Sequence, residues 1–366
     1  MLLFMPTLVY SEKDCVKNHF REIALTGEKA MIVTGKHSSR KNGSLDDVTA
    51  VLNQEKIPYI LFDDIEENPS VETVMRAREL AVSKNADFII GIGGGSPLDA
   101  AKAISLMAAN PKASEEVLYQ NNPLPYLPII CVPTTCGTGS EVTPYSILTL
   151  HKQKTKKSIS HKIYPTLALL DTKYLKTAGR SCIVNTSVDA LSHLVESYLN
   201  TNSNALNRIY SEQGLRMWAG FKDNLKNDTL SEKDYENMLH ASMVAGIAIT
   251  HTGTSLPHGL SYTVTYELGV PHGKAVGMFL GGYVDNYKDK NEAGRVLELL
   301  GFSDAKEMCS YLNELLGRTE LPPELLSADA DSILANEGKL KNYPFKVTKD
   351  ELINMLNNAT NTCVDM

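Results

Sequence analysis

The sequence predicts a chain of two domains, an α/β N-terminal half with a parallel sheet and an all-α C-terminal half. Three observations predict this fold class. Short apolar segments alternate with amphipathic ones in the first half, which is typical of strands and helices along a parallel sheet. Beyond residue 180 the apolar residues recur at helical spacing and strand-like segments become scarce. The 366 residues also exceed the size of about 250–300 at which single cores stop growing. We therefore expect domains of residues 1–180 and 181–366.

The elements follow from local patterns. Buried strands are short apolar runs rich in β-branched residues, whereas helices show apolar residues three and four positions apart. The predicted strands lie within 1–10 and at 30–34, 59–62, 88–92, 127–132 and 167–170. In the first half, helices are predicted at 45–56, 71–83 and 100–109, with a polar loop at 36–44. Helices of the second half are predicted at 184–199, 205–224, 231–249, 292–300, 305–316 and 349–358.

Composition excludes several functional classes. The chain has 36 Lys+Arg against 43 Asp+Glu, a net charge of −7, which does not fit the basic footprint of a nucleic-acid binder. Its apolar runs are shorter than the roughly 20 residues of a membrane span. The N-terminus lacks the basic region of a signal peptide, and the six cysteines contain no C-x-x-C pair. We expect reduced thiols, a cytoplasmic location, and neither a nucleic acid nor a membrane as partner.

A glycine-rich turn follows the strand at 88–92. It reads G-G-G-S-P-L-D over residues 93–99 and leads into the helix at 100–109. Glycines allow a ligand to approach the backbone closely, Ser96 is a good N-cap, and Pro97 suits the first helical position. Strand, glycine turn and helix N-terminus together offer N–H groups to a phosphate. The alternative is an ordinary tight turn before a well-capped helix.

A second loop follows the strand at 127–132. It reads P-T-T-C-G-T-G-S-E over residues 133–141 and is dense in hydroxyl groups and glycine. Hydroxyl groups can donate to phosphate or ribose oxygens, and they can equally close an ordinary turn. We interpret Cys136 as a bystander, because no His or Lys adjoins it in the sequence.

Four residues of the second half predict a metal site. Asp189 and His193 are four apart and so share one face of a helix. His258 and His272 each stand in a Pro-His-Gly, which places them at the ends of elements. Three imidazoles and a carboxylate suit a divalent metal such as Fe²⁺ or Zn²⁺. The alternative is that histidines are scattered without function, since the chain has nine; His251, seven residues before His258, is a further candidate for the same pocket.

Together, these motifs resemble the iron-containing (group III) alcohol dehydrogenase family. The resemblance extends over nearly the whole chain, through residues 93–99, 133–141 and 189–196 and the two Pro-His-Gly histidines. It implies a Rossmann-like dinucleotide-binding domain followed by a helical metal-binding domain, the architecture shared with dehydroquinate synthases. It also implies a homodimer and the metal ligands Asp189, His193, His258 and His272.

The resemblance further implies a set of cofactor contacts. The pyrophosphate would lie along Gly94, Gly95, Ser96 and Asp99. The nicotinamide side would be lined by Thr134, Thr135, Thr138 and Thr143. Asn68 matches a family position near the cofactor, and Lys157 matches the lysine that touches the ribose.

Two positions depart from the family pattern. Members that use NAD often carry Asp after the first V-T strand, whereas this chain has Gly35, followed by Lys36, Ser39 and Arg40. Glycine leaves room for a 2′-phosphate that the cations can bind, so we predict NADP(H) over NAD(H); otherwise the basic residues are merely solvated. Tyr262 stands where many members have a second His assigned to proton transfer. No catalytic residue is therefore identified, and Tyr262 and His251 are the candidates for a proton relay.

The predicted function is that of a metal-dependent alcohol dehydrogenase or aldehyde reductase. It would transfer a hydride between NADP(H) and a small primary alcohol or aldehyde, with Fe²⁺ as the metal and Zn²⁺ as the alternative. Residues 255–270 contain few cations that would select an acidic substrate. One alternative is a glycerol dehydrogenase or another polyol or keto reductase on the same fold. Another, of a different class, is a non-catalytic NADP(H)-binding sensor.

Overall fold

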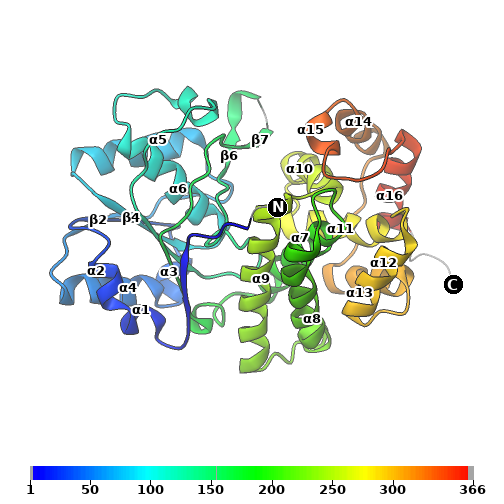
Figure 1. Cartoon of the computed structure of the whole chain (residues 1–366), viewed down its shortest axis with the longest axis horizontal. Coiled ribbons are helices and arrows are strands. Elements are labelled where there is room, and N and C mark those ends of the chain that lie inside the picture. The colour runs from blue at the N-terminus through cyan, green and yellow to red at the C-terminus, as the bar shows by residue number, and fades with distance from the viewer. Residues whose placement is uncertain (1–2, 154, 362–366) are drawn as a thin grey trace. The chain divides into compact units, whose positions relative to one another are not determined.

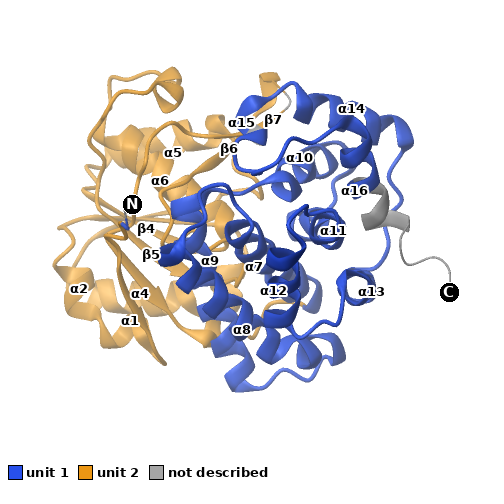
Figure 2. Cartoon of the chain, turned by 45° about the vertical axis from the view of Figure 1, so that its right-hand side comes forward, with its two compact units in different colours: residues 1–3, 180–366 blue, residues 4–179 orange. Residues whose placement is uncertain are grey.

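The computed structural model describes residues 3–153 and 155–361. The chain divides into two compact units, which Figure 2 distinguishes by colour. One unit is Phe4–Gly179, here called the N-terminal unit. The other runs from Arg180 onward, with Leu3 at the start of the chain also assigned to it, and is called the C-terminal unit. A parallel sheet lies in the first and helices make up the second, which confirms the predicted fold class.

The N-terminal unit contains a parallel sheet of six described strands. They are β1 (Leu8–Ser11), β2 (Ala30–Thr34), β3 (Tyr59–Phe62), β4 (Phe88–Gly93), β5 (Ile129–Pro133) and β8 (Leu167–Leu170). Their order is β1-β8-β5-β4-β2-β3. In the register, Met31 of β2 pairs with Ile60 of β3 and with Ile89 of β4. The apolar runs at 30–34, 59–62 and 167–170 thus form strands with the predicted bounds.

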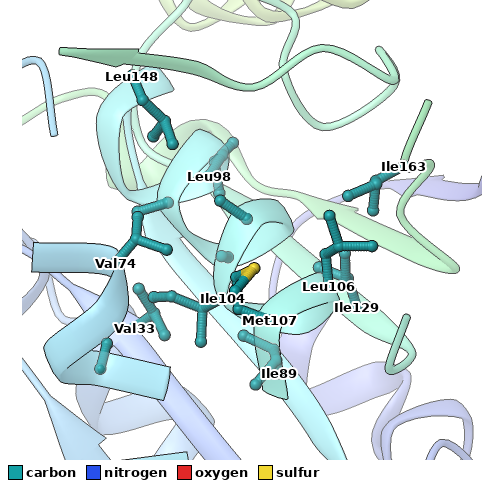
Figure 3. Close-up of a cluster of buried hydrophobic side chains, with 14 of the residues drawn as sticks. Val33, Val74, Ile89, Leu98, Ile104, Leu106, Met107, Ile129, Leu148 and Ile163 are labelled. Atoms are coloured by element: carbon teal, nitrogen blue, oxygen red, sulfur yellow. The ribbon is translucent and has the colours of Figure 1, made fainter. Parts of the chain in front are cut away.

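Alternating side chains bury both faces of this sheet. Met31 and Ile89 face α5 (Val71–Ser83) and α6 (Gly95–Ala109), in the cluster that Figure 3 shows around Ile104 and Met107. The neighbouring strand residues Ile32 and Ile90 belong to the cluster on the other face. That face is covered by α1 (Cys15–Asn18), α2 (Phe20–Ala24) and α4 (Ser44–Gln54) (Figure 1). Burial on both faces explains why the central strands are continuous apolar runs rather than alternating patterns.

Several short elements differ from the predictions. Ser38–Lys41 forms a single helical turn, α3, inside the predicted loop. An antiparallel hairpin of β6 (Ile147–Leu150) and β7 (Thr155–Ser158) was not expected, because four-residue strands with Lys-Lys give little periodic signal. Helix α6 begins at Gly95 rather than at residue 100. The remaining short turns of this unit are η1 (Glu115–Tyr119), η2 (His151–Gln153) and η3 (Thr172–Tyr174).

The described part of the C-terminal unit is helical. Its helices are α7 (Arg180–Tyr198), α8 (Ala205–Asn227), α9 (Glu232–Thr252), α10 (Leu256–Leu268), α11 (His272–Asp285), α12 (Lys290–Leu300), α13 (Ala305–Leu316), α14 (Pro323–Leu334), α15 (Glu337–Leu340) and α16 (Lys349–Asn361). Capping boxes start α8 at Asn204 and α9 at Ser231. Among the described residues, no helix is both long and apolar enough to cross a membrane.

Candidate cofactor and metal sites

The sheet of the N-terminal unit reverses its strand order at β2. Strand β3 pairs with one side of β2, and β4, the next strand in the chain, pairs with the other side. In open parallel sheets, ligands bind outside the carboxyl ends of the strands at such a reversal. The two strand ends are joined by the Thr34 hydroxyl, which donates to the Ile92 carbonyl at 2.8 Å. The residues after β2 and the glycine turn after β4 therefore lie at the expected ligand position.

The glycine turn brings the N-terminus of α6 against the second loop. Gly93 has a φ of +148°, which side chains rarely adopt. A Cβ at Gly95 would lie 2.6 Å from Thr138 Cγ2, and one at Gly94 would lie 3.1 Å from Thr135 Oγ1. Only glycine lets the two loops pack this closely. The N-cap of α6 is Gly94, without a side-chain cap, so the prediction of Ser96 as N-cap was wrong. Its uncapped first turn offers N–H groups of the kind that bind phosphate.

Asp99 belongs to a buried polar network. Its Oδ1 accepts from the Ser140 hydroxyl at 2.6 Å and its Oδ2 accepts from the Ile147 N–H at 2.8 Å. The fully buried ammonium of Lys102 donates to Ser140 at 2.7 Å and approaches the Thr143 hydroxyl at 3.4 Å. Burial raises the pKa of Asp99 and lowers that of Lys102. Both oxygens of Asp99 are thus engaged within the protein, where they hold the second loop to α6.

Asn68 lies beside the first turn of α6. Its N–H donates to Ser96 Oγ at 3.0 Å, and its side-chain oxygen accepts from Lys156 Nζ at 2.7 Å. Lys157, the residue predicted for the ribose, instead places its Nζ 5.0 Å from the ring centroid of Tyr119. Successive residues of a strand face opposite sides, so Lys156 contacts Asn68 whereas Lys157 contacts Tyr119. The ribose contact of Lys157 stays a prediction, and Lys156 is a further candidate for the cofactor site.

Lys36 and Arg40, which follow β2, are both paired with carboxylates. Lys36 Nζ lies 2.8 Å from Asp64, and Arg40 lies 2.7 Å from Asp63. Between them, Ser39 is buried, and its hydroxyl has no hydrogen-bond partner among the described residues. A Cβ at Gly35 would lie 3.3 Å from the Ile65 carbonyl oxygen. The two side chains predicted to bind a 2′-phosphate, Lys36 and Arg40, thus each form an ion pair with an aspartate that the sequence analysis did not consider.

The C-terminal unit brings the four predicted metal ligands together. Asp189 Oδ1 lies 3.3 Å from His258 Nε2, 3.7 Å from His272 Nε2 and 3.9 Å from His193 Nε2. The rings of His193 and His258 stack with centroids 4.4 Å apart. Asp189 and His193 come from adjacent turns of α7, whereas His258 lies in the first turn of α10 and His272 begins α11. Asp189, His193 and His258 are buried.

The donor atoms fit a divalent cation. Asp189 Oδ1 and His258 Nε2 are buried and have no hydrogen-bond partner among the described residues, although they face each other. One ligand atom each from Asp189, His258 and His272 lies within 4.8 Å of the others. Burial raises the pKa of Asp189, but the neighbouring imidazoles outweigh it and hold that pKa well below its usual range. A carboxylate that stays ionised beside converging imidazoles is the donor set of a first-row metal.

Glu196 is a further member of the site that the sequence analysis left unassigned. It is fully buried on α7, and its Oε1 lies 2.5 Å from His258 Nδ1. Burial lowers the pKa of His258, but the Glu196 and Asp189 carboxylates raise it to about 10. The signal was present in the sequence, because positions 189, 193 and 196 follow one face of a helix.

Glycines of α11 set the position of His272. A Cβ at Gly273 would lie 1.8 Å from the backbone oxygen of Asn185 in α7, and one at Gly277 would lie 2.5 Å from Val188 Cγ1. Glycines four apart share a face of α11, so this face packs directly on the backbone of α7. The close approach brings the start of α11 to the face of α7 that carries Asp189.

The two candidates for proton transfer differ in their surroundings. The ring of Tyr262 stacks on that of His272 with centroids 6.1 Å apart. His251, in the last turn of α9, donates from Nδ1 to the Ile247 carbonyl at 2.8 Å. Tyr262 thus lies beside a predicted ligand, and His251 is held within its own helix.

Comparison with known proteins gives a family. The family described as iron-containing alcohol dehydrogenase matches residues 6–172, and the C-terminal family of Fe-containing alcohol dehydrogenases matches residues 183–359. An NADPH-dependent butanol dehydrogenase of Clostridium saccharobutylicum is 28% identical over 316 residues, 82% of this chain and 80% of that protein. A 4-hydroxybutyrate dehydrogenase of Clostridium kluyveri is 32% identical over 311 residues, 78% of this chain and 82% of that protein.

A solved structure agrees with this result. The crystal structure of an iron-containing alcohol dehydrogenase from Thermotoga maritima superposes with a TM-score of 0.90 at 34% identity, covering 98% of this chain and 99% of that one. The two family matches together span most of the sequence and include every predicted metal and cofactor residue. The chain belongs to the iron-containing alcohol dehydrogenase family and is a metal-dependent oxidoreductase that acts on alcohols.

Proposed function

We propose that this protein interconverts a small primary alcohol and its aldehyde with NADP(H) and a divalent metal, Fe²⁺ with Zn²⁺ as the alternative. The convergence of Asp189, His193, His258 and His272 carries the proposal. A sensor that only binds NADP(H) has no need for such a buried donor set. Metal analysis of anaerobically purified protein, followed by turnover of butanal with NADPH, tests it. Bound metal with turnover supports the proposal, whereas full activity of a metal-free His258→Ala variant would refute it.

Each residue has a defined part in this reaction. When bound, the metal supplies Lewis-acid polarisation of the substrate oxygen and the nicotinamide supplies or accepts the hydride. Asp189 and the three imidazoles hold and orient the cation. Tyr262, beside His272, is proposed to move the proton at its phenolic oxygen, with His251 as the alternative relay member. The unperturbed pKa of a phenol is about 10, so tyrosines in general move a proton near neutral pH only if that pKa is lowered or if other groups relay the proton.

The preference for NADP(H) is supported by the residues after β2. Gly35 lacks the carboxylate that would repel a 2′-phosphate, and the cations Lys36 and Arg40 follow it closely in the sequence. Their pairs with Asp64 and Asp63 are exposed, and water screens such pairs so strongly that a phosphate can compete for the cations. The test compares KM for NADPH and NADH in wild type and Arg40→Gln. We expect a lower KM for NADPH, raised about fivefold or more by the substitution; equal values for the two cofactors would contradict the preference.

The substrate is proposed from relatives and from the pocket segment. The similar proteins are described as butanol, 4-hydroxybutyrate and 1,3-propanediol dehydrogenases. Residues 255–270 contain no Lys or Arg to bind a substrate carboxylate, which favours uncharged alcohols. A panel of butanal, succinic semialdehyde, 3-hydroxypropanal and dihydroxyacetone with both cofactors separates the simple aldehyde from the acid, diol and glycerol-type alternatives.

A cytoplasmic homodimer is the proposed form of the enzyme. The dimer rests on the family resemblance. The buried thiols of Cys15 and Cys131 are free, which fits a reducing compartment. Light scattering of the eluted protein measures the mass, and a monomer at micromolar concentration would contradict the dimer.

A further inference from the structure

We infer that Glu196 is a positioning residue that fixes the ring orientation and the tautomer of His258, so that Nε2 of this histidine presents its lone pair to the metal. The inference rests on the proposed metal ligands and goes beyond them. It concerns a carboxylate that does not itself bind the cation.

The contacts of Glu196 define this role. Oε1 lies 2.5 Å from His258 Nδ1, and Oε2 accepts the backbone N–H of Ser255, the residue that starts α10. One fully buried carboxylate therefore holds both the ring of His258 and the beginning of its helix. Because each oxygen has its own donor, neither is directed at the cluster around Asp189.

The chemistry of the pair determines the tautomer. An ionised carboxylate only accepts hydrogen bonds, so Nδ1 of His258 must carry a proton. In the neutral ring the lone pair then resides on Nε2, the nitrogen that faces Asp189 Oδ1 at 3.3 Å. A lone pair and a carboxylate oxygen repel each other at that distance unless a proton or a metal ion lies between them, so the metal takes the place of a proton on Nε2. Carboxylates that hold the other nitrogen of a metal-binding histidine in this way raise metal affinity about 10–100-fold.

The helix that carries Glu196 adds geometric support. Positions 189, 193 and 196 follow one face of α7, so two ligands and the positioning carboxylate share one rigid element. His258 is 62 residues away in sequence and is oriented to that face by the Glu196 contact. A purely structural role would need only the bond to Ser255.

Glu196→Gln separates the two roles. Glutamine has the same size but only one acceptor oxygen, whereas Glu196 accepts from two donors. If the amide oxygen keeps the Ser255 N–H, the amide NH₂ faces Nδ1 of His258 and the proton moves to Nε2, where it blocks the metal. We expect the Kd for Zn²⁺, measured by competition with a chromophoric chelator, to rise about 10–100-fold. NADPH binding, which tests the fold of the N-terminal unit, should stay unchanged.

Asp329→Asn is the matched control. Asp329 is also a buried carboxylate of the C-terminal unit, and it accepts from Thr263 of the same helix α10 at 2.6 Å. Loss of its charge should change the Kd for Zn²⁺ by less than about threefold. Equal weakening in both variants would mean that general destabilisation, not the tautomer, sets the affinity, and would overturn the inference.

A measurement on the wild-type protein does not depend on any variant folding. With ¹⁵N-labelled histidine and bound Zn²⁺, the His258 signals, assigned by their loss in His258→Asn, should show the proton on Nδ1 and the metal on Nε2. Metal on Nδ1, or a Glu196→Gln variant with wild-type Zn²⁺ affinity, would overturn the inference and leave the proposed function standing. Absence of Zn²⁺ and Fe²⁺ binding by wild type would overturn the proposed metal site as well.

Discussion

Glu141 is a buried carboxyl group at the end of the second loop, and its Oε1 has no hydrogen-bond partner among the described residues. Burial raises its pKa from 4.5 to about 7. Between pH 4.5 and about pH 7, Glu141 therefore keeps its proton in the folded protein, whereas the same carboxyl group has released it in the unfolded chain. Stability therefore falls as the pH rises through this window, and the loss is complete above about 7.

Glu141→Gln should remove this pH dependence. Relative to wild type, the variant should gain about 2–3 kcal/mol of stability between pH 5 and pH 8, because each pKa unit corresponds to about 1.4 kcal/mol. Thermal unfolding at the two pH values measures the gain. A difference in Tm between variant and wild type that is the same at both values would contradict the assignment.

Lys156 and Lys157 form a natural pair for a test of the cofactor site. Burial lowers the pKa of Lys156 to about 8, and its ammonium contacts Asn68 beside the first turn of α6. Lys156→Met should raise the Kd for NADPH about 5–30-fold, the effect of losing about 1–2 kcal/mol from a charged hydrogen bond. The control Lys157→Met, which alters an exposed contact with Tyr119, should stay within about twofold.

The pH profile gives a second readout for Lys156. A lysine is charged below its pKa, so NADPH affinity in wild type should decrease as the pH rises through about 8. In Lys156→Met, fluorescence titrations between about pH 7 and pH 9 should give a constant Kd. A decrease that persists in the variant would assign the titration to another group.

The helices that the sequence pattern missed include α10 and α11, which carry His258 and His272, as well as α14. Helix α10 starts with Leu-Pro-His-Gly and α11 contains four glycines, residues that weaken a helical signal. Tertiary packing outweighs this low propensity, because glycine is what permits contact between the backbones of α11 and α7. The Pro-His-Gly flanks did predict correctly that both histidines lie at the ends of elements, which the structure shows to be helix starts.

Gly273→Ala tests this contact. The added methyl group would overlap the Asn185 backbone oxygen, so α11 and its His272 must move away from α7. We expect a loss of about 1–3 kcal/mol of stability from overpacking, and Zn²⁺ binding at least about tenfold weaker. Gly294→Ala on α12, where a Cβ meets open space, should instead be neutral or stabilising by up to about 1 kcal/mol. Unchanged Zn²⁺ affinity in Gly273→Ala would show that α11 can shift without moving the ligand.

At the scale of the whole molecule, each unit contains its own set of proposed ligand contacts. The cofactor residues all lie within Phe4–Gly179, and the metal ligands all follow Arg180. The predicted domains of residues 1–180 and 181–366 divide the cofactor residues and the metal ligands in the same way. Zn²⁺ and NADPH should therefore each slow the hydrogen exchange of backbone amides mainly in one unit.

Hydrogen exchange measures this directly. Zn²⁺ added to the metal-free protein should slow exchange in α7 and in the first turns of α10 and α11, since a ligand stabilises the folded elements that bind it. NADPH should slow exchange at residues 93–99 and 133–143. If Zn²⁺ slowed exchange at residues 93–99 as strongly as in α7, the proposal that each unit binds its own ligand would be contradicted.

The sequence by itself determined the fold class, the strands at 30–34, 59–62 and 167–170, and the pairing of Asp189 with His193. These features depend on the nature and spacing of residues close together in the chain, which periodicity encodes. Tertiary structure alone decided that Glu196 meets His258, that Lys156 rather than Lys157 meets Asn68, and that Asp63 and Asp64 accompany the cations after β2. Tertiary structure also decided that both carboxylate oxygens of Asp99 accept hydrogen bonds from within the protein, from Ser140 and Ile147. Such contacts join segments distant in sequence, and only the packing of strands and helices brings them within hydrogen-bond distance.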